Sequence, residues 1–175
     1  MKELNIIFTK SKKKLPIGSW AIRWWTKKPY SHVARKVILM GDIPMYYQAN
    51  EYSVNYEHES VFNQKHLLID SFCLEITDEC SKNVSRACLE EAGKEYALKQ
   101  NIGIVLVDIA KRFGIRMKNP WKKGRNCSEL IYTNVLKIMI PKLDYDENLI
   151  VPHQIEEIIL KYFTKDDNGL YKIIE

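Results

Sequence analysis

One histidine and one cysteine, far apart in the chain, lie in sequence settings that favour catalytic chemistry. His32 follows Pro29-Tyr30-Ser31 and begins an apolar run, whereas Cys127 follows Gly124-Arg125-Asn126 and begins a helical pattern. A thiol at the start of a helix is readily deprotonated, because unpaired backbone N–H groups stabilise the thiolate. A histidine on a rigid strand can act as a general base. If the two side chains meet, the sequence predicts a cysteine hydrolase or acyltransferase.

The residues around Cys127 favour a position in the first helical turn. Asn126 is a good helix N-cap, and Glu129, three residues later, completes a pattern like a capping box. Backbone N–H groups in such a turn can also hold an oxyanion. Cysteine is, however, among the most buried residue types, so a packing role for Cys127 stays open on this evidence.

The elements that must position these two residues indicate an α+β fold. Hydrophobic periodicity predicts strands at 4–9, 32–40, 45–50, 67–76 and 170–174. It predicts helices at 18–26, 84–99, 102–113, 127–140 and 152–163, the last with Pro152 in its first turn. Because strands and helices do not alternate regularly, we expect an antiparallel sheet packed against helices, one of which begins at Cys127. The length is typical of one domain, 1–175.

Two segments carry a resemblance to a known family. Trp20 to Val33, which includes Tyr30-Ser31-His32-Val33, and Asn126-Cys127-Ser128-Glu129-Leu130 resemble the circularly permuted NlpC/P60 branch of papain-like cysteine hydrolases. That branch includes YiiX-like proteins, relatives of lecithin retinol acyltransferase and small phage or prophage proteins. The resemblance implies a papain-like fold in which the histidine strand precedes the cysteine helix. It also implies amide or ester chemistry at Cys127, with His32 as the base and with no metal or organic cofactor.

The same resemblance points to a third residue on the strand after His32. The branch often has a Glu-Ala pair there, and the matching pair in this chain is Gln48-Ala49. An amide can orient an imidazole, as asparagine does in papain-like enzymes.

The hairpin register offers a second criterion, because paired residues share a sheet face. A turn centred just after Gly41 pairs His32 with Glu51 and points Gln48 away, whereas a one-residue shift pairs His32 with Tyr52 and brings Gln48 to its side. We favour Gln48, with Glu51 as the second candidate.

Basic and aromatic residues precede both proposed reactive residues. The chain has a net charge of +5, and its positive residues gather before His32 and before Cys127. If the two sites meet, we expect a positive rim that attracts an anionic peptide or lipid substrate. The predicted rim residues are Trp25, Lys27, Lys28, Trp121, Lys122, Lys123 and Arg125.

The remaining tryptophans, histidines and cysteines receive structural interpretations. Trp20 and Trp24 have helical spacing that predicts core packing. His58, His66 and His153 show no ligand spacing and are predicted to be surface or hydrogen-bonded structural residues. The other cysteines, Cys73, Cys80 and Cys88, are expected to be packing residues, and no cysteine spacing predicts a metal site.

Three functional hypotheses follow from these residues. The first is a thiol hydrolase that cleaves an amide bond, with a peptidoglycan peptide as the favoured substrate. The second keeps the site for a lipid ester or thioester, as a hydrolase or acyltransferase. The third is a non-enzymatic basic adaptor or virion-associated protein, although no motif predicts nucleic-acid binding.

The apolar runs are too short to predict a transmembrane helix, and no signal peptide is apparent. The sequence therefore predicts a cytoplasmic protein, with virion association or release by lysis as alternatives. The tryptophans leave contact with a membrane surface open.

Overall fold

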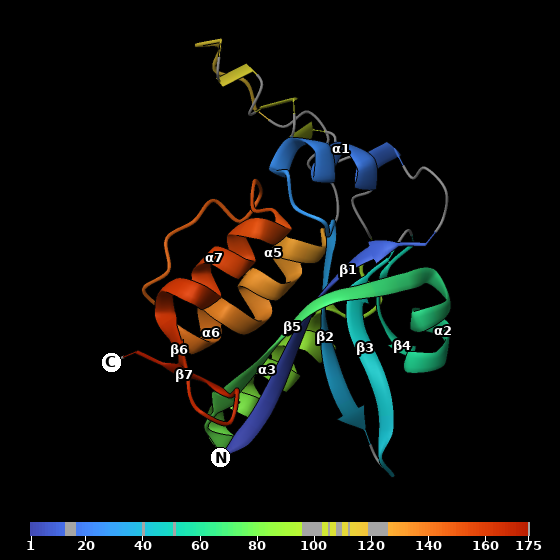
Figure 1. Cartoon of the computed structure of the whole chain (residues 1–175), viewed down its shortest axis with the longest axis vertical. Helices are drawn as coiled ribbons and strands as arrows, with labels where there is room; N and C mark the ends of the chain where they lie inside the picture. The colour runs from blue at the N-terminus through green and yellow to red at the C-terminus, as the bar shows by residue number, and fades with distance from the viewer. Residues whose placement is uncertain are drawn as a thin grey trace.

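The computed structural model describes residues 1–12, 17–39, 41–50, 52–95, 103–104, 106–107, 110–111, 113–118 and 126–174. Within these residues the chain has an α+β fold, in which a mixed seven-stranded sheet packs against helices (Figure 1). The strand order is β4-β3-β2-β1-β5-β7-β6. All neighbouring strands are antiparallel except β5 and β7, which are parallel. The expectation of a wholly antiparallel sheet is therefore wrong at this one pair.

The elements have the following bounds. The strands are β1 (Lys2–Ser11), β2 (His32–Leu39), β3 (Ile43–Ala49), β4 (Val54–His58), β5 (His66–Ile76), β6 (Phe163–Lys165) and β7 (Tyr171–Ile173). The helices are α1 (Ile17–Thr26), α2 (Glu59–Lys65), α3 (Asp78–Glu91), α5 (Cys127–Ile131), α6 (Lys137–Met139) and α7 (Pro152–Tyr162), with a π-helical turn η1 (Tyr132–Leu136) between α5 and α6.

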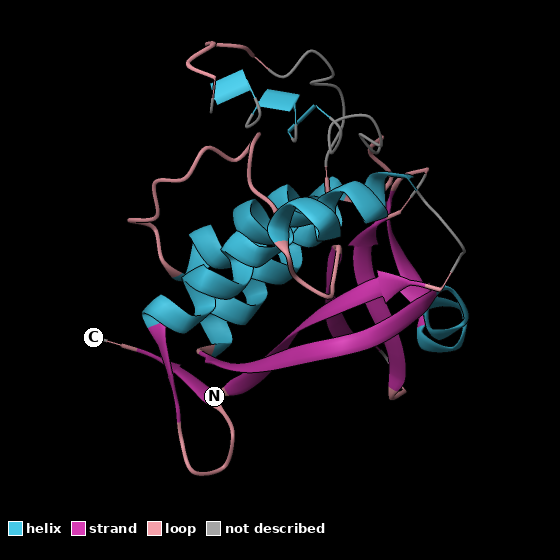
Figure 2. Ribbon diagram, turned by 45° about the horizontal axis from the view of Figure 1, so that its top comes forward, coloured by secondary structure: helices cyan, strands magenta, loops and turns pink. Residues whose placement is uncertain are grey.

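The two faces of the sheet carry cores of different size. Helices α3, α5, α6 and α7 gather on one face of the sheet (Figure 2). Helix α2 covers the other face, where it contacts β3, β4 and β5. The larger core contains Phe8 and Val33 from neighbouring strands together with Leu130 from α5. The smaller core, beneath α2, consists of Ile7, Ala34, Tyr46 and Phe62. This separation follows from the two-residue period of the strands, which sends successive side chains to opposite faces.

Most of the predicted elements are present, with corrections at their ends. The predicted strands at 32–40 and 67–76 correspond to β2 and β5, and the helix at 152–163 corresponds to α7. The helix expected from about 84 begins at Asp78, because the Thr77 side chain accepts a hydrogen bond from the Cys80 backbone N–H. Strands β4 and β6 and helix α2 were missed by the sequence patterns.

The helix that begins at Cys127 runs through α5, η1 and α6 and ends at Met139, just before the predicted stop at Pro141. The Thr133 hydroxyl donates to the Glu129 carbonyl at 2.9 Å. Such back-bonding competes with the regular helix ladder and accompanies bends, and here it lies where the helix widens into η1. No described helix is long and apolar enough to cross a membrane.

Candidate active site

Cys127 lies in the first turn of α5, and the cap predicted from the sequence is present. Asn126 has extended backbone angles, and its Oδ1 accepts a hydrogen bond from the Glu129 backbone N–H at 2.8 Å. This bond satisfies one of the free N–H groups of the first turn and fixes where the helix starts. Cys127 is only 2% exposed. Its reactivity therefore depends on what lies against the thiol inside the protein.

His32 is the first residue of β2 and is anchored from the neighbouring strand. The Ser31 backbone N–H donates to the Thr9 carbonyl at 3.0 Å, and His32 itself pairs with Thr9 in the β1–β2 ladder. The β2–β3 ladder starts only at the pair Arg35–Tyr47. The start of β2 is thus held on one side by β1, and His32 is half-buried.

The structure brings His32 and Cys127 into contact, because α5 packs against β2. The two side chains lie close enough for each to shift the pKa of the other. Burial acts to raise the pKa of Cys127, but the charge and hydrogen bond of His32 outweigh it and lower the pKa below its usual range. The Val33 backbone and the Ser128 hydroxyl contribute in the same direction. Burial acts to lower the pKa of His32, yet the net direction is upward because of Cys127, Gln48 and Glu57. The pair therefore favours a thiolate and an imidazolium.

Gln48 contacts the opposite side of the imidazole. His32 Nε2 and Gln48 Oε1 are 2.9 Å apart. Because an amide oxygen only accepts, His32 donates from Nε2, which leaves its other ring nitrogen for Cys127. Gln48 is fully buried, so this hydrogen bond is shielded from water.

The hairpin register differs from both registers considered in the sequence. Pairs Arg35–Tyr47 and Leu39–Ile43 centre the turn on Gly41, so that residues 34 and 48 are opposite each other. Neither the pairing of His32 with Glu51 nor that with Tyr52 is found. Residue 48 shares a sheet face with its partner 34, and residues 32 and 34 share a face because they are two apart. Gln48 therefore lies on the His32 face, as in the second of the two registers. Glu51 lies outside the described residues.

A carboxylate behind Gln48 fixes which end of the amide faces His32. Gln48 Nε2 donates to Glu57 Oε2 at 2.8 Å, and the other oxygen of Glu57 is paired with Lys65. A carboxylate accepts and never donates when ionised, so it selects the amide NH₂ and turns the amide oxygen toward His32. A continuous chain of contacts thus runs from Cys127 through His32 and Gln48 to Glu57.

The sequence analysis did not identify Glu57, although a signal for its strand exists. Val54 and Tyr56 alternate with Asn55 and Glu57, which is the two-residue period of a strand. The pairing of Gln48 with Asn55 then places Gln48 and Glu57 on one face.

A second histidine lies against the His32 ring. The rings of His32 and His66 are stacked with centroids 4.9 Å apart, and His66 stacks in turn on Phe62 at 4.4 Å. His66 Nδ1 lies 3.3 Å from the hydroxyl of Thr9, which is fully buried. The predicted structural role of His66 holds, and the structure adds direct contact with the candidate site.

The other three cysteines have thiol pKa values that are raised rather than lowered. Burial and the nearby Glu3 raise the pKa of Cys73 to about 11. Burial also raises the pKa values of Cys80 and Cys88, despite the nearby Arg35. Cys127 is the one cysteine of the four whose pKa is lowered. Within the described part of the chain, no three His, Cys, Asp or Glu side chains form a group that could hold a metal ion.

The predicted positive rim is only partly covered by the described residues. Lys27 is exposed and Trp25 is half-buried. Lys28 forms an ion pair with Glu156, which also accepts a hydrogen bond from the buried Tyr30 hydroxyl at 2.6 Å. Lys28 thus helps to join the segment before β2 to α7. Trp121, Lys122, Lys123 and Arg125 lie outside the described residues.

The prediction that Trp20 and Trp24 are core residues is wrong. Trp20 is 50% exposed and Trp24 is 63% exposed, and their rings stack on each other with centroids 6.0 Å apart. Helical spacing shows that the two rings share a face of α1, but it does not show what covers that face. In this structure the face is open.

Comparison of the chain with protein families and with curated proteins finds no match. Among solved structures, the chain is similar to the crystal structure of metalloprotein yiiX from Escherichia coli O157:H7. The TM-score is 0.45 at 15% sequence identity, with 74% of this chain and 90% of that chain covered. A similarity at this level says nothing about activity, and the assignment of a function depends on the site itself.

Proposed function

We propose that the protein is a papain-like thiol hydrolase that cleaves an amide bond, with Cys127 as nucleophile and His32 as base. The observation that carries this proposal is the contact between the buried Cys127 thiol and an imidazole that Gln48 holds from its other side. The nucleophile therefore contacts the base, and the base contacts the orienting group, which is the arrangement that activates a thiol. The permuted NlpC/P60 resemblance of the sequence agrees with this order of residues.

The proposed reaction has two steps. The Cys127 thiolate attacks the carbonyl carbon, and backbone N–H groups of the first α5 turn stabilise the oxyanion. Collapse of this intermediate breaks the C–N bond, and His32 gives its proton to the leaving amine, which yields a thioester. Water then attacks the thioester, His32 takes one proton from that water, and the carboxylic acid leaves as the thiolate re-forms. These steps use only the named side chains, the backbone and water.

The favoured substrate is a peptide with free carboxylates, such as a cell-wall peptide. Net charge is +5, and the described surface around the start of β2 includes the exposed Lys27. A positive surface concentrates anionic substrates. The exposed pair Trp20 and Trp24 favours a second candidate, a lipid ester or thioester that the same thiol would cleave.

The test is to find the acyl group on Cys127. Wild-type protein is incubated with peptide amides, peptidoglycan fragments and lipid esters, and the intact mass is followed at short times. We expect a transient acyl adduct on Cys127 that is absent from Cys127→Ser and His32→Ala. Cys73→Ser, which changes a cysteine with a raised pKa, is the matched control and should turn over normally. Turnover by Cys127→Ser at the wild-type rate would reject the proposal, and an absence of turnover with every substrate class would favour the non-enzymatic adaptor.

A further inference from the structure

The α1 end of the molecule exposes apolar side chains that the proposed amide hydrolysis does not use. Trp20 and Trp24 form a stacked aromatic pair on α1, with planes only 13° apart. The described part of 103–118 lies beyond α1 in both views, on the side away from the β2–β3 turn (Figures 1 and 2). Here Phe113 is 78% exposed and Ile115 is 59% exposed. Exposed apolar groups of this size, gathered at one end, indicate an interaction surface.

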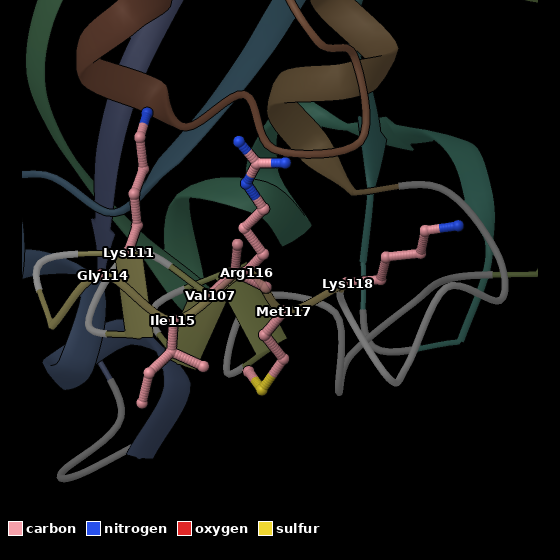
Figure 3. A pocket seen from close by; sticks show the side chains of 7 residues that line it. All are labelled: Val107, Lys111, Gly114, Ile115, Arg116, Met117 and Lys118. Carbon is pink, nitrogen blue, oxygen red and sulfur yellow. The ribbon is translucent and has the colours of Figure 1, made fainter.

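Basic side chains accompany these apolar residues. Lys111, Arg116 and Lys118 are exposed and line, with Ile115 and Met117, an open pocket of about 500 Å³. In Figure 3 the side chains of Ile115 and Met117 extend from the backbone to the side opposite Lys111 and Arg116. The sequence from 111 to 125 contains no acidic residue. The described residues of 111–118 therefore carry positive charge on one side and apolar groups on the other.

We propose that this end of the molecule binds the surface of an anionic phospholipid bilayer. Tryptophan favours the membrane–water interface, because its ring is apolar while its N–H can still contact water or headgroups. Apolar residues enter the headgroup–acyl boundary, and neighbouring lysines and arginines pair with lipid phosphates. The segregation of Ile115 and Met117 from Lys111 and Arg116 matches these two layers.

The same observations favour a bilayer over a nucleic acid. A single-stranded nucleic acid needs open aromatic faces on which bases can stack. Trp20 and Trp24 instead stack on each other, and in the described part of 103–118 the exposed ring of Phe113 stands among aliphatic groups such as Ile115 and Met117. Mixed aromatic and aliphatic groups with a positive border are typical of interfacial membrane contacts.

This surface lies at the end of the molecule where the candidate site begins. His32 starts β2 shortly after α1, and Cys127 starts α5 at the same end (Figure 1). Binding to a bilayer would bring the site close to the headgroups. The inference does not depend on which bond the site cleaves, since it concerns surface residues only.

The experiment is flotation of the full chain with vesicles of phosphatidylcholine alone or mixed with phosphatidylglycerol. We expect partition into the mixed vesicles only, and a loss of binding as salt is raised. Each positive residue contributes about a fivefold gain at an anionic surface, so the triple change Lys111→Gln, Arg116→Gln and Lys118→Gln should weaken binding about a hundredfold. The double change Trp20→Ser and Trp24→Ser should weaken it at least about tenfold. The control is Leu89→Ser, which removes a leucine that is 64% exposed on α3 and should leave binding unchanged.

Several outcomes would overturn the inference. These are equal partition into neutral vesicles, wild-type binding by the triple variant, and retention on single-stranded DNA with no binding to vesicles. Circular dichroism of each variant checks that the fold is intact. Cys127→Ala should float like the wild type, so failure of the catalytic proposal and failure of this one give different results.

Discussion

Replacement of Glu57 tests whether the candidate site depends on the orientation of the Gln48 amide. In the wild type, Glu57 accepts from Gln48 Nε2 at 2.8 Å, and Gln48 accepts from His32 at 2.9 Å. Glu57→Leu removes the acceptor, so the amide can turn and present its NH₂ group to His32. A protonated imidazole cannot accept from that group, and the support of the imidazolium by Gln48 is lost.

The size of the effect follows from the hydrogen bond that is lost. A hydrogen bond to a charged group is worth about 1.5–3 kcal/mol. One pKa unit corresponds to about 1.4 kcal/mol, so the pKa of His32 should fall by about 1–2 units in Glu57→Leu. The sign follows from the wild type, in which Gln48 and Glu57 both act to raise this pKa. The imidazolium should then be lost at a lower pH as pH rises, and the alkaline limb of any turnover should move down with it.

The assay is NMR titration of ¹³C-labelled histidine, which needs no substrate. The chain contains four histidines, and His32→Ala identifies the signal of His32. Glu57→Gln is the matched control, because its amide oxygen can still accept from Gln48 while Lys65, whose side chain is 46% exposed, turns away. The orientation argument is refuted if His32 titrates identically in Glu57→Leu and wild type, or if Glu57→Gln lowers the pKa as far as Glu57→Leu.

Three further predictions concern the neighbours of this network. His32→Ala should slow alkylation of Cys127 by iodoacetamide at mildly acidic pH by at least about a hundredfold, because the largest influence that opposes burial and lowers the thiol pKa is then lost; mass spectrometry measures this, and an unchanged rate would contradict the contact. His66→Ala should also slow this alkylation, whereas His66→Phe should preserve it, because a phenyl ring keeps the stack on His32; equal rates in the two variants would show that the stack is not needed. Tyr30→Phe should lower the free energy of unfolding in urea by about 1.5–3 kcal/mol, because it removes a buried hydrogen bond to the Glu156 carboxylate; a negligible change would mean that Lys28 alone satisfies Glu156.

The sequence predicted the parts of the site that local patterns encode. The N-cap at Asn126 and the strand that starts at His32 both follow from adjacent residue types. The register of the β2–β3 hairpin was harder to predict, because it depends on the conformation of the turn rather than on the strand residues. Gly41 and Asp42 both adopt positive φ, of 73° and 62°, and the pairs nearest the turn leave residues 40–42 between them. A difference of one residue in that turn changes every partner along the hairpin.

Other features could not be predicted because they depend on distant neighbours. The spacing of Trp20 and Trp24 is the same whether another element covers α1 or not, so periodicity alone could not show that the face is open. Glu57 belongs to a strand of only five residues, β4, and its role appears only when β4 pairs with β3. From the sequence, the contact between His32 and Cys127 is implied only by the resemblance to a known family. In the structure it results from the packing of α5 on β2.

The position of the negative charge distinguishes this site from one with a carboxylate directly beside the imidazole. Here the Gln48 amide contacts His32, and the negative charge lies behind that amide, on the Glu57 carboxylate to which Gln48 donates. The support of His32 therefore crosses three strands, from β2 through β3 to β4, and β4 is the last strand in the sheet order. Edge strands open more easily than central ones, and the outer side of β4 is held at Val54, which exchanges backbone hydrogen bonds with Gly93 and Lys94. Opening of β4 would release the Gln48 amide while Cys127 and His32 stay in place, so the reactivity of the thiol should follow the pairing of β4 with β3.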